Sequence, residues 1–208
     1  MHDIMLDLET LGTGPNAAVI AIGACFFDIQ TRHIGATFYC TLKLEDVVRG
    51  GGEMDARTVL WWLAQSDDAR RAIYAEQEGS ARTPTHALTE FSHFITDNST
   101  EPPRMWGNGS NFDNVILASM YQRHGMELPW KFWNDRCYRT VKAMHPDGQI
   151  NLERNDTKHH ALEDALHQTR TLIALLNPNP GPARQLGADL DDDDPTQPIE
   201  HIRECDAQ

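Results

Sequence analysis

Four carboxylates spaced along the chain are the residues best suited to do chemistry. Asp7 and Glu9 stand one residue apart in the stretch DLETLG, and Asp113 and Asp164 follow much later. Carboxylates brought together repel each other unless cations neutralise them, and sites made of carboxylate oxygen suit hard ions such as Mg²⁺ or Mn²⁺. Two such ions roughly 3.5–4 Å apart can activate a water and stabilise the leaving oxygen of a phosphodiester. If these acids meet in the fold, the expected chemistry is nucleotidyl hydrolysis.

Each acid also has an ordinary alternative reading. In a strand, successive side chains alternate, so Asp7 and Glu9 would project from one face about 7 Å apart. Alternatively, the strand ends near Leu6 and both acids are solvated turn residues. Asp113 fits a favourable charge in a first helical turn, and Asp164 fits a solvent-facing helix acid. The hypothesis of a metal site therefore depends on the four acids together.

Hydrophobic period and turn residues predict the elements that position these acids. Residues 2–8, 17–28 and 33–43 are predicted as three strands of a meander joined by turns. Helical spacing then follows in several segments, with one short strand among them: helices over 56–66, 67–77, 83–98, 111–125 and 159–176, and a strand over 102–108. We therefore expect an α/β fold in which helices flank a mixed sheet that begins as an antiparallel meander.

Composition divides the chain into one domain and a tail. A chain of 208 residues with 40% hydrophobic content can bury a sizeable core. The whole chain has a net charge of −13, and residues 177–208 contribute eight acids against two arginines. Such a composition buries little apolar surface. We expect a folded domain over 1–176 and an acidic, flexible tail over 177–208, with a docking tail or phosphate mimic as the alternative.

Several classes of protein are disfavoured by what the sequence lacks. No stretch approaches the roughly 20 apolar residues of a membrane span, and the start has no basic segment or cleavage site typical of a signal peptide. The four cysteines form no CxxC pair, which argues against a disulfide framework or a zinc knuckle. P-loop, GxSxG and HExxH motifs do not occur. We therefore expect a cytoplasmic protein with reduced thiols and no membrane partner.

In their order, DLETLG, NFDN and HHALED resemble the three motifs of the DEDDh 3′-to-5′ exonucleases, an RNase H-like superfamily. The match spans residues 4 to about 175, and LWWLAQS and WGNGSNFDNVIL resemble the small bacterial and phage branch. That branch includes exoribonuclease-like proteins and the nuclease region of exonuclease VIII. The resemblance implies an RNase H-like sheet with parallel later strands and an exonuclease domain over 1–176. It also implies an enzyme that trims single-stranded RNA or DNA from the 3′ end to nucleoside 5′-monophosphates. Because relatives often pair, we expect a homodimer.

The same resemblance implies roles for individual residues. Four acids would hold two Mg²⁺ or Mn²⁺ ions and one histidine would accept the proton of the attacking water, the set being Asp7, Glu9, Asp113 and Asp164 with His159. An imidazole suits that role near neutral pH. Main-chain groups of Thr10 and the apolar side chain of Leu11 would contact the terminal nucleotide.

Three further residues are candidate substrate contacts. Trp61 and Trp62 present aromatic faces of the kind that stack on unpaired bases for about 1–3 kcal/mol per base. Adjacent helical positions point about 100° apart, so at most one of them is expected to serve the core, and core packing or a subunit contact is the alternative for each. Asn111 is the third candidate. Many family members carry an Asn at the position of Gly109, and the neighbouring Asn108 and Asn111 are the candidates to replace its hydrogen bonds.

Helix geometry and the motif disagree about the catalytic histidine. If both histidines were helical, His160 and Asp164 would share a face, whereas His159 and Asp164 would lie about 140° apart. The motif favours His159, and the two criteria agree if His159 lies in the approach to the helix. We follow the motif and predict His159.

Residues 123–142 carry five basic residues against two acids, which makes them the best candidate for tracking phosphates, with a solvated face as the alternative. Two other functions stay open from the residues alone. One is an RNase H-like endonuclease, and the other is a non-catalytic nucleic-acid-binding module.

Overall fold

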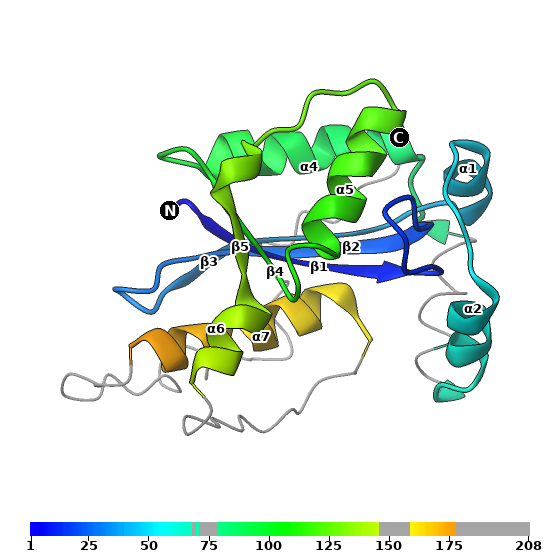
Figure 1. Cartoon of the computed structure of the whole chain (residues 1–208). Coiled ribbons are helices and arrows are strands. Elements are labelled where there is room, and N and C mark those ends of the chain that lie inside the picture. The colour runs from blue at the N-terminus through cyan, green and yellow to red at the C-terminus, as the bar shows by residue number, and fades with distance from the viewer. Residues whose placement is uncertain (68–69, 71–78, 146–158, 178–208) are drawn as a thin grey trace, which may run out of the picture.

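The computed structural model describes residues 1–67, 70, 79–145 and 159–177. The strands are β1 (Asp3–Thr10), β2 (Val19–Phe27), β3 (Ile34–Thr41), β4 (Arg104–Gly107) and β5 (Asp135–Cys137). The helices are α1 (Leu44–Arg49), α2 (Ala56–Leu63), α4 (Pro84–Asn98), α5 (Asp113–Arg123), α6 (Tyr138–Met144) and α7 (Ala161–Leu176), with a 3₁₀ turn η1 (Phe132–Asn134) (Figure 1). Apart from residues 67, 70 and 177, the helix expected over 67–77 and the tail expected over 177–208 lie outside the described residues.

One mixed sheet of five strands, in the order β3-β2-β1-β4-β5, runs through the described part of the chain. The first three strands pair antiparallel, as the meander predicted, and β4 and β5 then run parallel to β1. The expected α/β class with a mixed sheet is therefore confirmed. The sequence did not predict β5, α1 or α6.

The two faces of β1 belong to two different cores. Ile4, Leu6 and Leu8 pack in the larger core with residues of α4 and α5. Met5 packs in the second core with residues of α6 and α7. Figure 1 shows the same division, with α4 and α5 covering one face of the sheet and α6 and α7 the other. Because side chains alternate along a strand, Asp7 and Glu9 share the face of Met5, which α7 covers.

The start of α7 differs from the predicted one by two residues. His159 has a left-handed backbone with φ of 65°, so it lies before the helix. His160 is the N-cap, and its Nδ1 accepts a hydrogen bond from the N–H of Glu163 at 3.5 Å. The helix therefore begins at Ala161, because the side chain of His160 satisfies one of the N–H groups that a helix start leaves without an intrahelical partner.

Within the described residues, no helix combines the length and the apolar character needed to cross a membrane.

Candidate active site

Glu9, His159 and Asp164 form a cluster at the end of β1. Each offers one ligand atom, and these atoms all lie within 4.8 Å of one another. Glu9 comes from the end of the strand, His159 from the turn before α7 and Asp164 from the first turn of that helix. Since the left-handed turn holds His159 outside the helix, the five-residue spacing that separates two helical side chains by about 140° does not apply to it.

Asp7 lies among the other acids and is bound by the last helix. Gln168 Nε2 donates a hydrogen bond to Asp7 Oδ1 at 2.6 Å. Burial raises the pKa of Asp7 well above its usual range, and the charges of Asp113, Glu9 and Asp164 raise it further, whereas the bond from Gln168 lowers it. The four acids predicted as metal ligands therefore interact electrostatically around Asp7.

Asp113 reaches this group from the start of α5 on the other side of β1. It is 3% exposed, and its Oδ1 accepts a hydrogen bond from the N–H of Leu8 at 3.2 Å. Burial raises the pKa of Asp113 to about 7, although hydrogen bonds from the main chain of Leu8 and Asn108 oppose the rise. Burial makes this carboxyl costly to ionise, and a bound cation would stabilise its charged form.

Gly23 lets the last helix approach the sheet at the level of the acids. It pairs with Asp7 across the β1·β2 register. A Cβ at position 23 would lie 2.2 Å from the main chain of Ala161 and Leu162, which is closer than real Cβ contacts. Only glycine therefore permits the first turn of α7 to contact β2 here, which holds Asp164 near Glu9.

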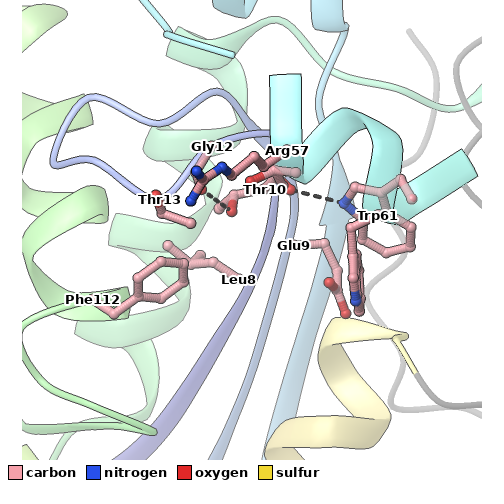
Figure 2. A pocket seen from close by; sticks show the side chains of 10 residues that line it. Leu8, Glu9, Thr10, Gly12, Thr13, Arg57, Trp61 and Phe112 are labelled. Atoms are coloured by element: carbon pink, nitrogen blue, oxygen red, sulfur yellow. Dashed lines mark hydrogen bonds between the residues drawn. The ribbon is translucent and has the colours of Figure 1, made fainter. Parts of the chain in front are cut away.

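A pocket of about 440 Å³ opens beside the acid cluster. It lies between the end of β1, the loop that follows and α2, and its lining residues are Leu8, Glu9, Thr10, Gly12, Thr13, Arg57, Thr58, Trp61, Trp62 and Phe112. Figure 2 shows Glu9 and Trp61 on one side of this pocket and Phe112 on the other, with the Glu9 carboxylate directed toward the start of α7. A cavity of this size, lined by one carboxylate and several aromatic side chains, suits a small ligand that has both polar groups and an aromatic ring.

The two tryptophans play different structural parts. Trp62 is 5% exposed, and its Nε1 donates to the carbonyl of Thr10 at 2.9 Å. Trp61 is 45% exposed and meets the ring of His159 edge-on, with centroids 4.9 Å apart. The prediction that at most one of them serves the core is confirmed. The hydrogen bond from Trp62 also fixes the main chain of Thr10 at the pocket.

Other predicted residues lie elsewhere. Leu11 is partly buried and packs against Ile20 and Trp62 in a small core under α1 and α2. Asn111 is exposed and does not line the pocket. In the basic stretch, Arg139 donates to the carbonyl of Asn108 at 2.7 Å, which holds that cation beside the turn that precedes Asp113.

Sequence reasoning missed three residues of the site. Gln168 lies four residues after Asp164 on α7, and that spacing, which places both on one helix face, was the available signal. Phe112 is the neighbour of Asp113 but carries no chemical group that marks it. Arg57 lines the pocket from the first turn of α2, and nothing in its sequence surroundings singles it out.

The fold is shared with solved nucleases. The nuclease domain of 3′hExo, described as a DEDDh family member bound to rAMP, has a TM-score of 0.58 at 13% identity, covering 86% of this chain and 92% of that one. E. coli exonuclease I in complex with a dA16 oligonucleotide has a TM-score of 0.53 at 17% identity, covering 85% of this chain and 41% of that one. The expected fold, a mixed sheet flanked by helices, is therefore confirmed, and this chain shares it with these solved exonucleases.

Sequence comparison identifies the family. An exodeoxyribonuclease of Enterobacteria phage T4 is 29% identical over 161 residues, which cover 67% of this chain and 70% of that protein. The family model of the 3′-5′ exoribonuclease Rv2179c-like domain matches residues 2–176. The chain belongs to this family and is a 3′-5′ exonuclease. Membership also implies divalent metal ions, and the donor set of carboxylates beside one imidazole fits such ions.

Proposed function

We propose that this chain hydrolyses single-stranded nucleic acid, RNA or DNA, from the 3′ end with the help of two Mg²⁺ or Mn²⁺ ions and releases nucleoside 5′-monophosphates. The observation that carries the proposal is the cluster of Glu9, His159 and Asp164, whose ligand atoms lie within 4.8 Å of each other. The effect of the other three acids on the pKa of Asp7 supports it. Family membership favours this exonuclease over the endonuclease and the non-catalytic module.

In this proposal the acids hold the ions and His159 moves the proton. The metal ligands are Asp7, Glu9, Asp113 and Asp164. When bound, the divalent ions supply an activated water and stabilise the charge that develops on the leaving oxygen. His159 accepts the proton of the water as its oxygen bonds to phosphorus, and the bond from phosphorus to the 3′ oxygen of the preceding nucleotide breaks. The edge-on contact with Trp61 helps to orient the imidazole for this transfer.

The pocket beside the acids is the proposed site of the 3′-terminal nucleotide. Trp61 and Phe112 lie on opposite sides of it, an arrangement that fits a base between two aromatic side chains (Figure 2). The main chain of Thr10 lies at the pocket, held by Trp62. Arg57 adds a cation to a pocket that otherwise carries the negative charge of Glu9. We further propose that the enzyme is cytoplasmic. We also propose that it forms a homodimer, and light scattering of the purified chain tests this oligomeric state.

A time course with 5′-labelled single strands of DNA and RNA tests the activity. We expect the labelled strand to shorten one nucleotide at a time with Mg²⁺ or Mn²⁺, and to stay intact with chelator. Chromatography of the products should give nucleoside 5′-monophosphates. The DNA and RNA arms decide which sugar the enzyme prefers.

Two variants serve as a matched pair in this assay. Asp7→Ala removes a proposed metal ligand and is expected to be inactive, whereas Glu127→Gln removes an exposed acid outside the site and should keep full activity. Equal degradation by Asp7→Ala, or in the presence of chelator, would overturn the two-metal proposal. Internal cleavage of the strand would overturn the exonuclease mode.

A further inference from the structure

Two aromatic side chains stand exposed at the outer strand of the sheet, away from the pocket. Phe132 is 73% exposed and Trp133 is 63% exposed, and their rings contact each other with centroids 5.0 Å apart at 78°. They lie in η1, which leads directly into β5, the edge strand of the sheet (Figure 1). Contiguous exposed apolar side chains of this size usually mark a binding surface.

The backbone beneath the pair is held by hydrogen bonds. Asn134 Nδ2 donates to the carbonyl of Pro103 at 3.1 Å, and the N–H of Asn134 donates to the carbonyl of Lys131 at 2.8 Å. Trp130, which is buried, donates from Nε1 to Asp135 Oδ1 at 2.9 Å. The exposed rings therefore stand on a fixed support, which lowers the entropy lost when they bind a partner.

The charge around the pair is positive in a chain whose net charge is −13. Lys131 is exposed beside Phe132 in sequence, and Arg136 Nη1 donates to the carbonyl of Trp133 at 3.1 Å, which keeps its charge at the main chain of the pair. The neighbouring acid, Asp135, is turned inward. Its Oδ1 accepts hydrogen bonds from Trp130 and Asn114. The aromatic pair is therefore flanked by cations.

The pair also lies on a path from the proposed active site. Asn114, which binds Asp135, is the residue after Asp113. Through the register of β1, β4 and β5, Asp135 is level with Ile4, three residues before Asp7, and Trp133 lies in η1 two residues before Asp135. Arg139, beyond the other end of β5, lies beside the turn that precedes Asp113. A strand that leaves the acids along β5 would reach the rings within a few nucleotides.

We propose that Lys131, Phe132, Trp133 and Arg136 form a platform for the body of a single-stranded nucleic acid, a few nucleotides upstream of the bond that is cut. Phe132 and Trp133 stack on bases, and Lys131 and Arg136 contact phosphates. Aromatic faces combined with cations are the means by which proteins hold single strands without reading their sequence. The inference rests on the proposed function, since it assigns the upstream part of the same substrate.

Kinetics with two lengths of substrate test the platform. A dinucleotide does not reach it, whereas a strand of about twelve nucleotides does. For the double variant Phe132→Ala/Trp133→Ala we expect the KM of the long strand to rise about tenfold or more, with kcat and the KM of the dinucleotide unchanged. Val48→Ala, which trims another exposed apolar side chain on α1, should leave all four constants unchanged. Phe132→Tyr/Trp133→Tyr keeps aromatic faces and should restore most of the affinity.

Binding measured without turnover separates this inference from the proposed function. With chelator present, the anisotropy of a fluorescent strand of about twelve nucleotides should report a Kd about tenfold weaker for the double variant than for the wild type. An unchanged Kd and KM would overturn the platform. If light scattering shows that the double variant turns a dimer into a monomer, the rings are a subunit contact and the platform is also overturned. If the wild type degrades no strand, the proposed function fails, while the anisotropy still decides the platform.

Discussion

Gln168 Nε2 donates a hydrogen bond to Asp7 Oδ1 at 2.6 Å, which joins the last helix to the first strand across 161 residues of sequence. Burial and three neighbouring acids raise the pKa of Asp7. The hydrogen bond from Gln168 opposes that rise. Gln168 is 6% exposed, so it acts from within the protein rather than on a substrate. We assign it a positioning role for Asp7.

Loss of this bond is expected to weaken metal use. Gln168→Ala should raise the Mg²⁺ concentration needed for half-maximal activity about 10-fold to 100-fold, because outer partners of ligating carboxylates have effects of that size. Gln168→Glu puts another carboxylate beside Asp7 and should be more harmful. Titration of activity with Mg²⁺ measures both. Gln122→Ala, at an exposed position of α5, is the control, and an unchanged midpoint for Gln168→Ala would contradict the role.

Substitutions of the two adjacent histidines are expected to have different effects on catalysis and stability. His159→Ala should lower kcat by about 10²- to 10⁴-fold, as removal of a general base does, with little change in stability. His160→Ala should retain most of kcat but lower the free energy of unfolding by about 1 kcal/mol, because it removes the cap of α7. Steady-state kinetics and thermal unfolding separate the two. The reverse pattern would assign the base to His160.

We expect Asp113 to be required for activity and to lower the stability of the folded protein. Its pKa is about 7 in the folded protein against 3.8 as the usual value, so the folded state prefers the neutral carboxyl. In chelator, the destabilisation is absent below about pH 4, grows as the pH rises, and is complete above about pH 7. Asp113→Asn should remove it, giving a higher Tm than the wild type at pH 8 but a similar one at pH 4, with no activity. Equal melting curves at pH 8 would contradict this.

The two tryptophans at the pocket should separate binding from folding. Trp62→Ala is expected to lower the free energy of unfolding by about 3–5 kcal/mol, since it empties a buried site and removes the bond to Thr10. Trp61→Ala should change stability by less than about 1 kcal/mol but raise the KM. Denaturant unfolding and kinetics on one substrate measure both effects. A stable Trp62→Ala protein would show that the packing around this side chain contributes little.

The sequence indicated the four acids, because paired carboxylates in an apolar strand and an acid at a helix start are chemically conspicuous. The prediction of His159 came from the resemblance to the exonuclease motif. Period and turn residues also predicted the meander and most of the long helices. The start of α7 was placed two residues early, since a pattern of apolar spacing does not reveal that His159 has a left-handed backbone.

The remaining features depend on contacts between distant segments. β5 has only three residues, too few for a period, and it forms because its backbone pairs with β4. Arg57 and Phe112 enter the pocket through the way α2 and α5 pack around the end of β1. Such residues are defined by position in space, which local sequence does not encode.

Gly23 has no side chain and takes no part in proton transfer or metal binding, yet a survey of variants scored only by activity would class it with the catalytic residues. Any added carbon there meets the main chain of Ala161 and Leu162 and forces the first turn of α7 outward. The helix would carry Asp164 and Gln168, and with them the turn that holds His159, away from the acids of β1, although each side chain kept its place on its own segment. Loss of function at position 23 would therefore result from a greater distance between the acids of β1 and the residues of α7. A compensating substitution would have to let α7 move back toward the sheet, and it would not need to restore any catalytic group.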